Sequence, residues 1–238
     1  MSDDAELWAL RDLAEARRLQ EWMFSVLRPS APGPMLEIGA GIGTFSEFLL
    51  DAGASPLVLI EPEAACAAEL RERFASDARV EIVEELLPES PALRARPSTF
   101  RYALCQNVLE HIEDDVGALT SVVKALEPGG EVAVLVPAHP RLYGRVDKRF
   151  GHHRRYTRPG LRKLIQDAGA ELTSVQSFNM LGVPGWWVAG HSRLLDVNSG
   201  SLRAYEALVR FWRPIEDRLH PPVGLSLVAR ARRPAAAR

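Results

Sequence analysis

The sequence predicts an α/β protein with a mostly parallel sheet and helices on both faces. Between residues 35 and 137, short apolar runs alternate with amphipathic helical segments. Parallel strands need such crossover connections, so this order favours a sheet covered on both sides. The first apolar run, MLEIGAGIGT at residues 35–44, passes from a strand through three alternating glycines into a helix. That transition is typical of a helix N-terminus facing a ligand.

The individual elements follow from periodicity and from turn residues. Residues 3–28 are predicted to form a helical extension, because their apolar side chains recur near a 3.6-residue period and prolines follow. Strands are predicted at 35–39, 56–61, 80–84, 100–107, 131–137, 171–178 and 225–231, and helices at 44–50, 63–74, 115–126, 159–168 and 201–219. Residues 127–130 are predicted to form a turn, and 138–159 a polar loop with little apolar periodicity.

Composition limits the classes of function. The chain has 238 residues, a net charge of -2 and no apolar run of the roughly 20 residues that span a bilayer. The lack of a basic excess gives no support for a nucleic-acid partner. Two distant cysteines, Cys66 and Cys105, argue against a disulfide framework, and the acidic start of the chain lacks the basic region of a secretory signal. These features predict a cytoplasmic protein.

The glycine segment indicates the kind of ligand. Gly39, Gly41 and Gly43 are followed by Thr44, where a dinucleotide fingerprint requires glycine. Glu37, two residues before the first glycine, suits a cationic ligand better than a phosphate. Glu61 ends the next predicted strand, 22 residues after Gly39, where an acid accepts hydrogen bonds from ribose hydroxyls. The segment therefore predicts a site for a nucleoside with a positively charged arm.

Together with VLIEP at 58–62, QNVLEHIEDD at 106–115 and LEPGG at 126–130, this segment resembles class I S-adenosylmethionine-dependent methyltransferases. The resemblance covers residues 18–180 by motif. It implies a Rossmann-like sheet of seven strands with the last one antiparallel, and a single methyltransferase domain over residues 1–238. It also implies S-adenosylmethionine as cofactor and S-adenosylhomocysteine as product. Within that domain, 1–30 form an N-terminal helical cap, and 138–160 and 180–220 form acceptor-side insertions.

The resemblance also assigns cofactor contacts. Glu37 and the backbone of Gly39 and Gly41 would hold the methionine part, and Glu61 the ribose. Glu85 and Leu86 would flank the adenine, and Gln106 and Asn107 would border the methyl-donor end. Family members often carry a Gly-Asp pair where this chain has Glu84-Glu85-Leu86, so the adenine contact could fall on either glutamate.

The predicted loop at 137–156 concentrates acid–base groups at the carboxyl edge of the sheet. A subset of bacterial methyltransferases has a similar segment, matched here by Asp147, by GHHRRYT at 151–157 and by FNMLGVPGW at 178–186. We hypothesise that His152 is a base or orienting group for the acceptor, with Asp147 as its partner. Alternatively, Asp147, His152 and the arginines form a structural ion-pair cluster that holds the loop.

Other candidate residues belong to the same region. His111 is a third catalytic candidate, although it could instead cap a helix or pack against the cofactor. The predicted substrate-binding residues are His139, Tyr143, Arg154, Arg155, Tyr156, Asn179 and Trp186. Arg154 or Arg155 would bind an anionic group. Trp186 and Trp187, with Phe178 and Met180, would form an apolar acceptor wall or lid, unless these residues form core instead.

No metal is required by these patterns. Glu113, Asp114 and Asp115 lie at a predicted helix start, where acidic residues stabilise the helix macrodipole. We expect methyl transfer from S-adenosylmethionine to a small-molecule acceptor, most simply a hydroxyl. The alternatives are N-methylation of a small molecule or peptide, and a cofactor-binding module without transfer activity. Thr44 and Glu37 argue against an NAD-dependent oxidoreductase. The acceptor and the oligomeric state, monomer or homodimer, stay open.

Overall fold

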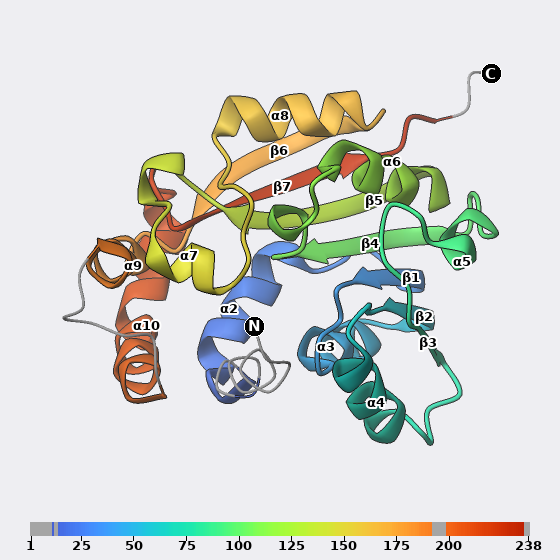
Figure 1. Ribbon diagram of the computed structural model, residues 1–238, viewed down its shortest axis with the longest axis horizontal. Coiled ribbons are helices and arrows are strands. Elements are labelled where there is room, and N and C mark those ends of the chain that lie inside the picture. Colours follow the sequence, from blue (N-terminus) through green and yellow to red (C-terminus); the bar gives the residue numbers. More distant parts are fainter. Residues whose placement is uncertain (1–10, 12–13, 192–198, 236–238) are drawn as a thin grey trace.

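The structure, a computed structural model, describes residues 11, 14–191 and 199–235. It centres on a seven-stranded sheet in the order β3-β2-β1-β4-β5-β7-β6 (Figure 1). The strands are β1 Gly33–Ile38, β2 Ala54–Ile60, β3 Val80–Val83, β4 Phe100–Gln106, β5 Leu126–Pro137, β6 Glu171–Phe178 and β7 Ser226–Arg232. Strand β7 runs antiparallel to β5 and β6, and the other paired strands run parallel. The predicted sheet, with its reversed last strand, is confirmed.

The helices connect these strands on both faces. They are α2 Arg17–Leu27, α3 Thr44–Asp51, α4 Ala64–Arg73, α5 Pro91–Arg94, α6 Asp115–Ala125, α7 Arg145–Arg149, α8 Arg158–Asp167, α9 Gly182–His191 and α10 Ser199–Leu219, with 3-10 turns η1 Leu109–His111 and η2 Pro140–Leu142. The chain first moves outward from β1 to β3 and then crosses back to β4. The carboxyl ends of β1 and β4 therefore flank the switch point where open α/β sheets bind ligands.

Alternate side chains of each strand enter two separate cores. Leu36 and Ile38 of β1 join the core under α6 and α8, whereas Met35 joins the core under α2 and α3. This is the two-residue period of a strand buried on both faces. Figure 1 shows α6 and α8 on one side of the sheet and α2, α3 and α10 on the other.

Helix α2 belongs to the second core. Trp22 is 1% exposed, and its ring centroid lies 4.5 Å from that of Phe178 at the end of β6. The indole Nε1 donates a hydrogen bond of 2.9 Å to Asp217 Oδ1 of α10. The described part of the N-terminal extension thus packs against β6 and α10. Residues 3–10 and 12–13 of the predicted extension lie outside the described residues.

Two sequence-based expectations about loops were wrong. Strand β5 already begins at Leu126, which pairs with Phe100 across a register shift. Gly129 and Gly130 exchange backbone hydrogen bonds with Arg233 beyond β7, so the predicted turn at 127–130 is an irregular strand start. The predicted loop at 138–159 contains η2 and α7, and α8 starts after Thr157, whose side chain accepts a hydrogen bond from Gly160 N. Within the described residues, no helix combines the length and hydropathy that a bilayer crossing requires.

Candidate active site at the carboxyl edge of the sheet

The glycine turn closes tightly against the end of β4. Gly39 has a φ of +68°, and a Cβ at this position would lie 2.5 Å from Val108 Cγ2. A side chain is therefore excluded by conformation and by space. The N–H of Gly39 donates to Ile60 O at 2.8 Å, and the N–H of Gly41 donates to Glu61 Oε2 at 2.7 Å. Both amide groups are occupied, so a ligand contact from these glycines would use their carbonyl oxygens.

Glu61 connects the glycine turn to the end of β2. Its second carboxylate oxygen accepts a 3.0 Å hydrogen bond from Glu63 N, and the side chain is largely buried. A carboxylate has about four acceptor positions, and two of those of Glu61 accept these backbone bonds. The structure thus holds Glu61 rigidly at the position where the sequence predicts a ribose contact.

Glu37 is a buried carboxylate inside β1. It is 4% exposed and accepts a 2.6 Å hydrogen bond from Ser46 Oγ in the first turn of α3. Burial raises the pKa of Glu37 to about 8; the Ser46 bond opposes this shift and the charge of Glu61 adds to it. A cation placed beside Glu37 would favour its ionised form. Ser46 was not among the predicted residues, and only its spacing of nine residues from Glu37 connects them in the sequence.

The predicted adenine contacts separate into two cases. The Glu85 carboxylate accepts hydrogen bonds from Ser90 Oγ and Ala92 N. Glu85 therefore contacts the start of α5 in this structure, and its predicted adenine contact stays a prediction. Leu86, by contrast, has a side chain 64% exposed, and remains a prediction. Glu84, the other alternative, forms a 2.8 Å ion pair with Arg71 on the surface.

Polar groups at the end of β4 face the same edge. Gln106 Oε1 is buried without a hydrogen-bond partner, which makes it an acceptor available to a donor. Asn107 is exposed, adopts a φ of +50°, and its N–H donates to Leu135 O at 2.8 Å. Both residues lie next to Val108, the side chain that contacts the glycine turn.

Asp147 organises the acceptor-side segment. This side chain is fully buried in α7 and accepts hydrogen bonds from Gly144 N at 2.9 Å and Arg155 Nε at 2.6 Å. It also lies 2.9 Å from His152 Nδ1 and 3.4 Å from Trp186 Nε1. Burial would raise the pKa of Asp147, but the bonds from His152 and Arg155 outweigh burial and lower it to about 2. An ionised acceptor fixes His152 with its proton on Nδ1.

Three predicted substrate ligands form contacts within the protein. Arg155 is buried, donates from Nη1 to Ala138 O at 2.9 Å and stacks on Trp186 at 4.9 Å. Arg154 forms a 3.0 Å ion pair with Asp115. The Tyr156 hydroxyl donates to Asp115 Oδ2 at 2.8 Å. These groups have partners within the protein, as the alternative of an ion-pair cluster holding the loop expects, and their role as substrate ligands stays a prediction.

Asp115 and its neighbour also explain the acidic run after η1. Asp114 accepts a 2.9 Å hydrogen bond from Gly117 N and caps α6. The interpretation of this run as a helix start is therefore confirmed.

His152 lies beside the η1 turn. Its ring meets that of His111 edge to face, with the two centroids 4.8 Å apart. The Tyr143 hydroxyl donates a hydrogen bond of 2.8 Å to the backbone oxygen of His152. Burial lowers the pKa of His111 to about 4, assisted by the charges of His152 and His153. Glu110 was not a predicted site residue. It is fully buried, and burial raises its pKa to about 8. Its place between apolar Leu109 and His111 gave no sequence signal of a polar site.

Three more predicted substrate ligands, His139, Asn179 and Trp186, have different surroundings. His139 has a φ of +60°, and its buried Nε2 is without a hydrogen-bond partner. Asn179 is buried; its Oδ1 accepts from Gly182 N at 2.9 Å and from the Tyr205 hydroxyl. Asn179 thus binds the first amide of α9, and its role as a substrate ligand stays a prediction. Trp186 belongs to α9, which packs against α7 (Figure 1).

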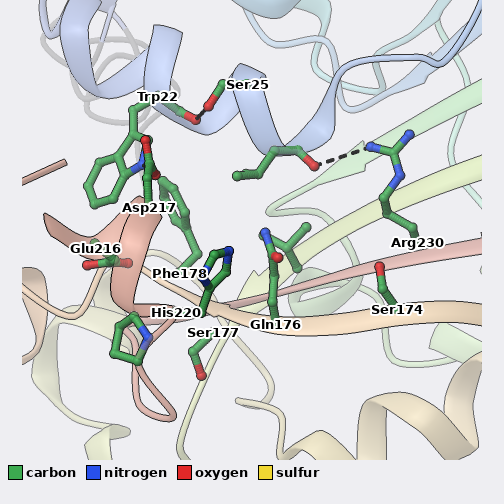
Figure 2. A pocket seen from close by; sticks show the side chains of 13 residues that line it. Trp22, Ser25, Ser174, Gln176, Ser177, Phe178, Glu216, Asp217, His220 and Arg230 are labelled. Carbon is green, nitrogen blue, oxygen red and sulfur yellow. Dashed lines mark hydrogen bonds between the residues drawn. The ribbon is translucent and has the colours of Figure 1, made fainter. Parts of the chain in front are cut away.

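A cavity of about 350 Å³ lies elsewhere, between α2, β6 and the end of α10. Figure 2 shows Trp22 and Asp217 pointing toward each other at its wall, with Arg230 on the far side. Of the residues predicted for the cofactor or acceptor, only Phe178 of the possible apolar wall is among the described residues that line this cavity. It is therefore distinct from the site at the carboxyl edge.

The strand order, the glycine turn and the acids at the ends of β1 and β2 define an α/β protein of the class I, S-adenosylmethionine-dependent methyltransferase type. Residues 9–175 match the family model described as "Methyltransferase domain", and the chain therefore belongs to that family. S-adenosylmethionine is its cofactor, as the sequence predicted.

The relatives agree with this class. The chain is 32% identical over 108 residues to the ubiquinone biosynthesis O-methyltransferase of Xanthomonas campestris pv. campestris (strain B100), a match that covers 43% of each chain. It thus spans less than half the length of the curated relatives it matches. An S-adenosylmethionine-dependent methyltransferase from Mesorhizobium loti is similar with a TM-score of 0.60 and 18% identity, covering 86% of this chain and 93% of that one. A putative methyltransferase complexed with the Haloferax volcanii Trm112 activator has a TM-score of 0.66 and 13% identity, covering 97% and 96%. At such identities these two structures show the fold alone.

Proposed function

We propose that this enzyme methylates a hydroxyl oxygen of a small molecule, with His152 receiving or orienting the hydroxyl proton. The observation that carries the proposal is the pair of His152 and Asp147 at the carboxyl edge, with Nδ1 and Oδ1 2.9 Å apart. Because Asp147 takes the Nδ1 edge, the Nε2 edge is the one left to face an acceptor. The name of the curated relatives, ubiquinone biosynthesis O-methyltransferase, also supports oxygen as the acceptor atom.

The residues at the ends of β1, β2 and β4 fit the cofactor. Burial raises the pKa of Glu37 to about 8, and an ammonium group of the methionine part beside it would favour its ionised form. Glu61 would accept the ribose hydroxyls, and the unpartnered Gln106 Oε1 would accept a donor at the methyl-donor end. Bound S-adenosylmethionine supplies an electrophilic methyl group on a sulfonium.

The protein's own contribution is positioning and proton transfer. A hydroxyl acceptor becomes a good nucleophile only as its proton leaves, and a neutral imidazole within hydrogen-bond reach serves this purpose. Asp147 fixes the tautomer and orientation of His152, and the Tyr143 hydroxyl holds the backbone carbonyl of the same residue. Trp186, stacked on Arg155, would close the acceptor side against water. The buried thiols of Cys66 and Cys105 fit the proposal of a cytoplasmic enzyme.

Single-turnover assays test this proposal. Soluble phenols such as 3,4-dihydroxybenzoate serve as hydroxyl probes, and anilines of the same shape serve as amine probes, with S-adenosylhomocysteine formation as the readout. We expect turnover with a phenol, and a loss of about 10²–10⁴-fold in the rate of His152→Ala. His153→Ala, which changes the exposed neighbouring residue, is the matched control and should keep the wild-type rate.

Two results would contradict the proposal. Turnover of anilines and not of phenols would point to N-methylation, because an amine needs less help in losing its proton. A wild-type rate in His152→Ala would remove the role of His152.

A further inference from the structure

Three potential metal ligands converge beside the proposed acceptor position. Each of Glu110, His111 and His152 offers one ligand atom, and these three atoms all lie within 4.8 Å of one another. Glu110 and His111 come from η1 after β4, whereas His152 comes from the segment after α7. The cluster therefore depends on the tertiary fold and leaves no motif of close spacing in the sequence.

The surroundings of the Glu110 carboxyl group independently favour a bound cation. Its side chain is 0% exposed, and the part of the chain that the structure describes provides neither carboxylate oxygen with a hydrogen-bond partner. An ionised carboxylate in such surroundings costs several kcal/mol unless a cation or a donor compensates it. The neighbouring rings of His111 and His152 each offer one ring nitrogen toward the same point. A cation bound there would take one ligand atom from each of the three side chains.

The backbone fixes the position of His152 relative to this turn. The N–H of His153 donates to Glu110 O at 2.8 Å, and Gly151 lies against His111, whose Nδ1 would be 4.0 Å from a Cβ on that glycine. Asp147 occupies the Nδ1 edge of His152. A metal-binding histidine usually donates its other ring N–H to a carboxylate or carbonyl, which fixes the orientation of the ring.

We propose that Glu110, His111 and His152 bind a divalent first-row transition-metal ion of the Zn²⁺ type, with Asp147 orienting His152. Two imidazoles and one carboxylate form a ligand set typical of Zn²⁺ and Fe²⁺ sites that keep an open coordination position. Metal–ligand bonds of about 2.0–2.2 Å place tetrahedral ligands roughly 3.4 Å apart. Ligand atoms that now lie up to 4.8 Å apart therefore need to approach one another by up to about 1.4 Å. The open position is the one available to a water or to an acceptor oxygen.

This inference rests on the proposed function for the place of the acceptor and specifies the role of His152 there: with a metal on Nε2, His152 would orient the acceptor hydroxyl through the ion and would not itself receive the proton. The metal site itself rests on Glu110, His111 and their geometry. It is measured in the absence of any methyl acceptor, so the two proposals fail separately.

The experiment uses untagged full-length enzyme that has been treated with EDTA and desalted. Zn²⁺ binding is measured by calorimetry, and Co²⁺ binding by its visible d–d absorption. The variants are Glu110→Gln, which keeps the side-chain shape without the charge, and His111→Gln. The matched control is His153→Gln, next to the ligand His152 but exposed. Binding of S-adenosylhomocysteine to each variant reports that the fold is intact.

We expect wild type and His153→Gln to bind one equivalent of Zn²⁺ and to give a Co²⁺ spectrum. Glu110→Gln and His111→Gln should bind Zn²⁺ at least about tenfold more weakly, while S-adenosylhomocysteine binding is unchanged. Absence of Zn²⁺ binding by wild type, or equal affinity in wild type and Glu110→Gln, would overturn the inference. If wild type binds no metal and His152→Ala still loses methyl transfer, the metal site is refuted and the proposed function stands.

Discussion

Replacing Glu37 with Gln should change how stability depends on pH. Burial raises the pKa of Glu37 from 4.5 to about 8, so between these values the folded protein holds a proton that the unfolded chain has released. Stability then falls as pH rises, because the unfolded state binds fewer protons than the native state. The stabilising contribution of protonated Glu37 is fully present below pH 4.5 and is lost as pH rises through about 8. Glutamine has no proton to lose and removes this dependence.

The magnitude follows from the linkage relation. One proton corresponds to about 1.4 kcal/mol per pH unit, so Glu37→Gln should gain about 2.7 kcal/mol on wild type between pH 5.5 and 7.5. Glu110, whose pKa is also raised to about 8, contributes the same slope to both proteins and cancels in the difference. Urea unfolding of both proteins at pH 5.5, 6.5 and 7.5 measures this difference in stability. Parallel stability curves for the two proteins would refute the reasoning, because they would mean that Glu37 does not carry the proton.

Further predictions concern function and packing. Glu37→Gln should lower the affinity for S-adenosylhomocysteine, measured by calorimetry, about 10- to 100-fold, because a hydrogen bond to a charged group contributes about 1.5–3 kcal/mol. Unchanged affinity would mean that Glu37 does not bind the methionine part. Arg155→Met should destabilise the fold by about 3–5 kcal/mol in urea, because it leaves Asp147 buried without its 2.6 Å partner, and a loss below 1 kcal/mol would contradict the structural role. Gly39→Ala should lower stability by about 1–3 kcal/mol, because its Cβ would meet Val108 at 2.5 Å in a left-handed conformation; a wild-type melting temperature would contradict this.

The sequence predicted the fold well because its signals were local. Apolar strands ending in glycine or acid lie one after another at 35–39 and 56–61, and each became a strand whose carboxyl end reaches the site. Glu61 and the glycine turn could be placed together because parallel strands end at the same edge. The start of β5 at Leu126 was missed because hydrogen bonds to Arg233, more than 100 residues away, hold a segment that reads locally as a turn.

The acceptor side could be predicted less completely because its contacts are long-range. Arginines, tyrosines and histidines in one loop indicate polar chemistry, but only the fold decides which of them face a ligand. Arg155 donates a hydrogen bond to Asp147, and Tyr156 donates one to Asp115. Both donors therefore have partners within the protein. Glu110 lies among buried apolar residues, and its unpaired carboxylate becomes visible only when His152, 42 residues on, is brought beside it.

We expect the cofactor to bind where β1, β2 and β4 end, with its ribose hydroxyls bound by Glu61. Calorimetric titration with S-adenosylhomocysteine of wild type, Glu61→Gln and the matched control Glu84→Gln tests it most directly, since Glu84 follows the neighbouring strand and pairs with Arg71 on the surface. Wild type and Glu84→Gln should bind one equivalent, and Glu61→Gln should bind at least about tenfold more weakly. Absence of binding to wild type, or equal binding by Glu61→Gln, would contradict the claim.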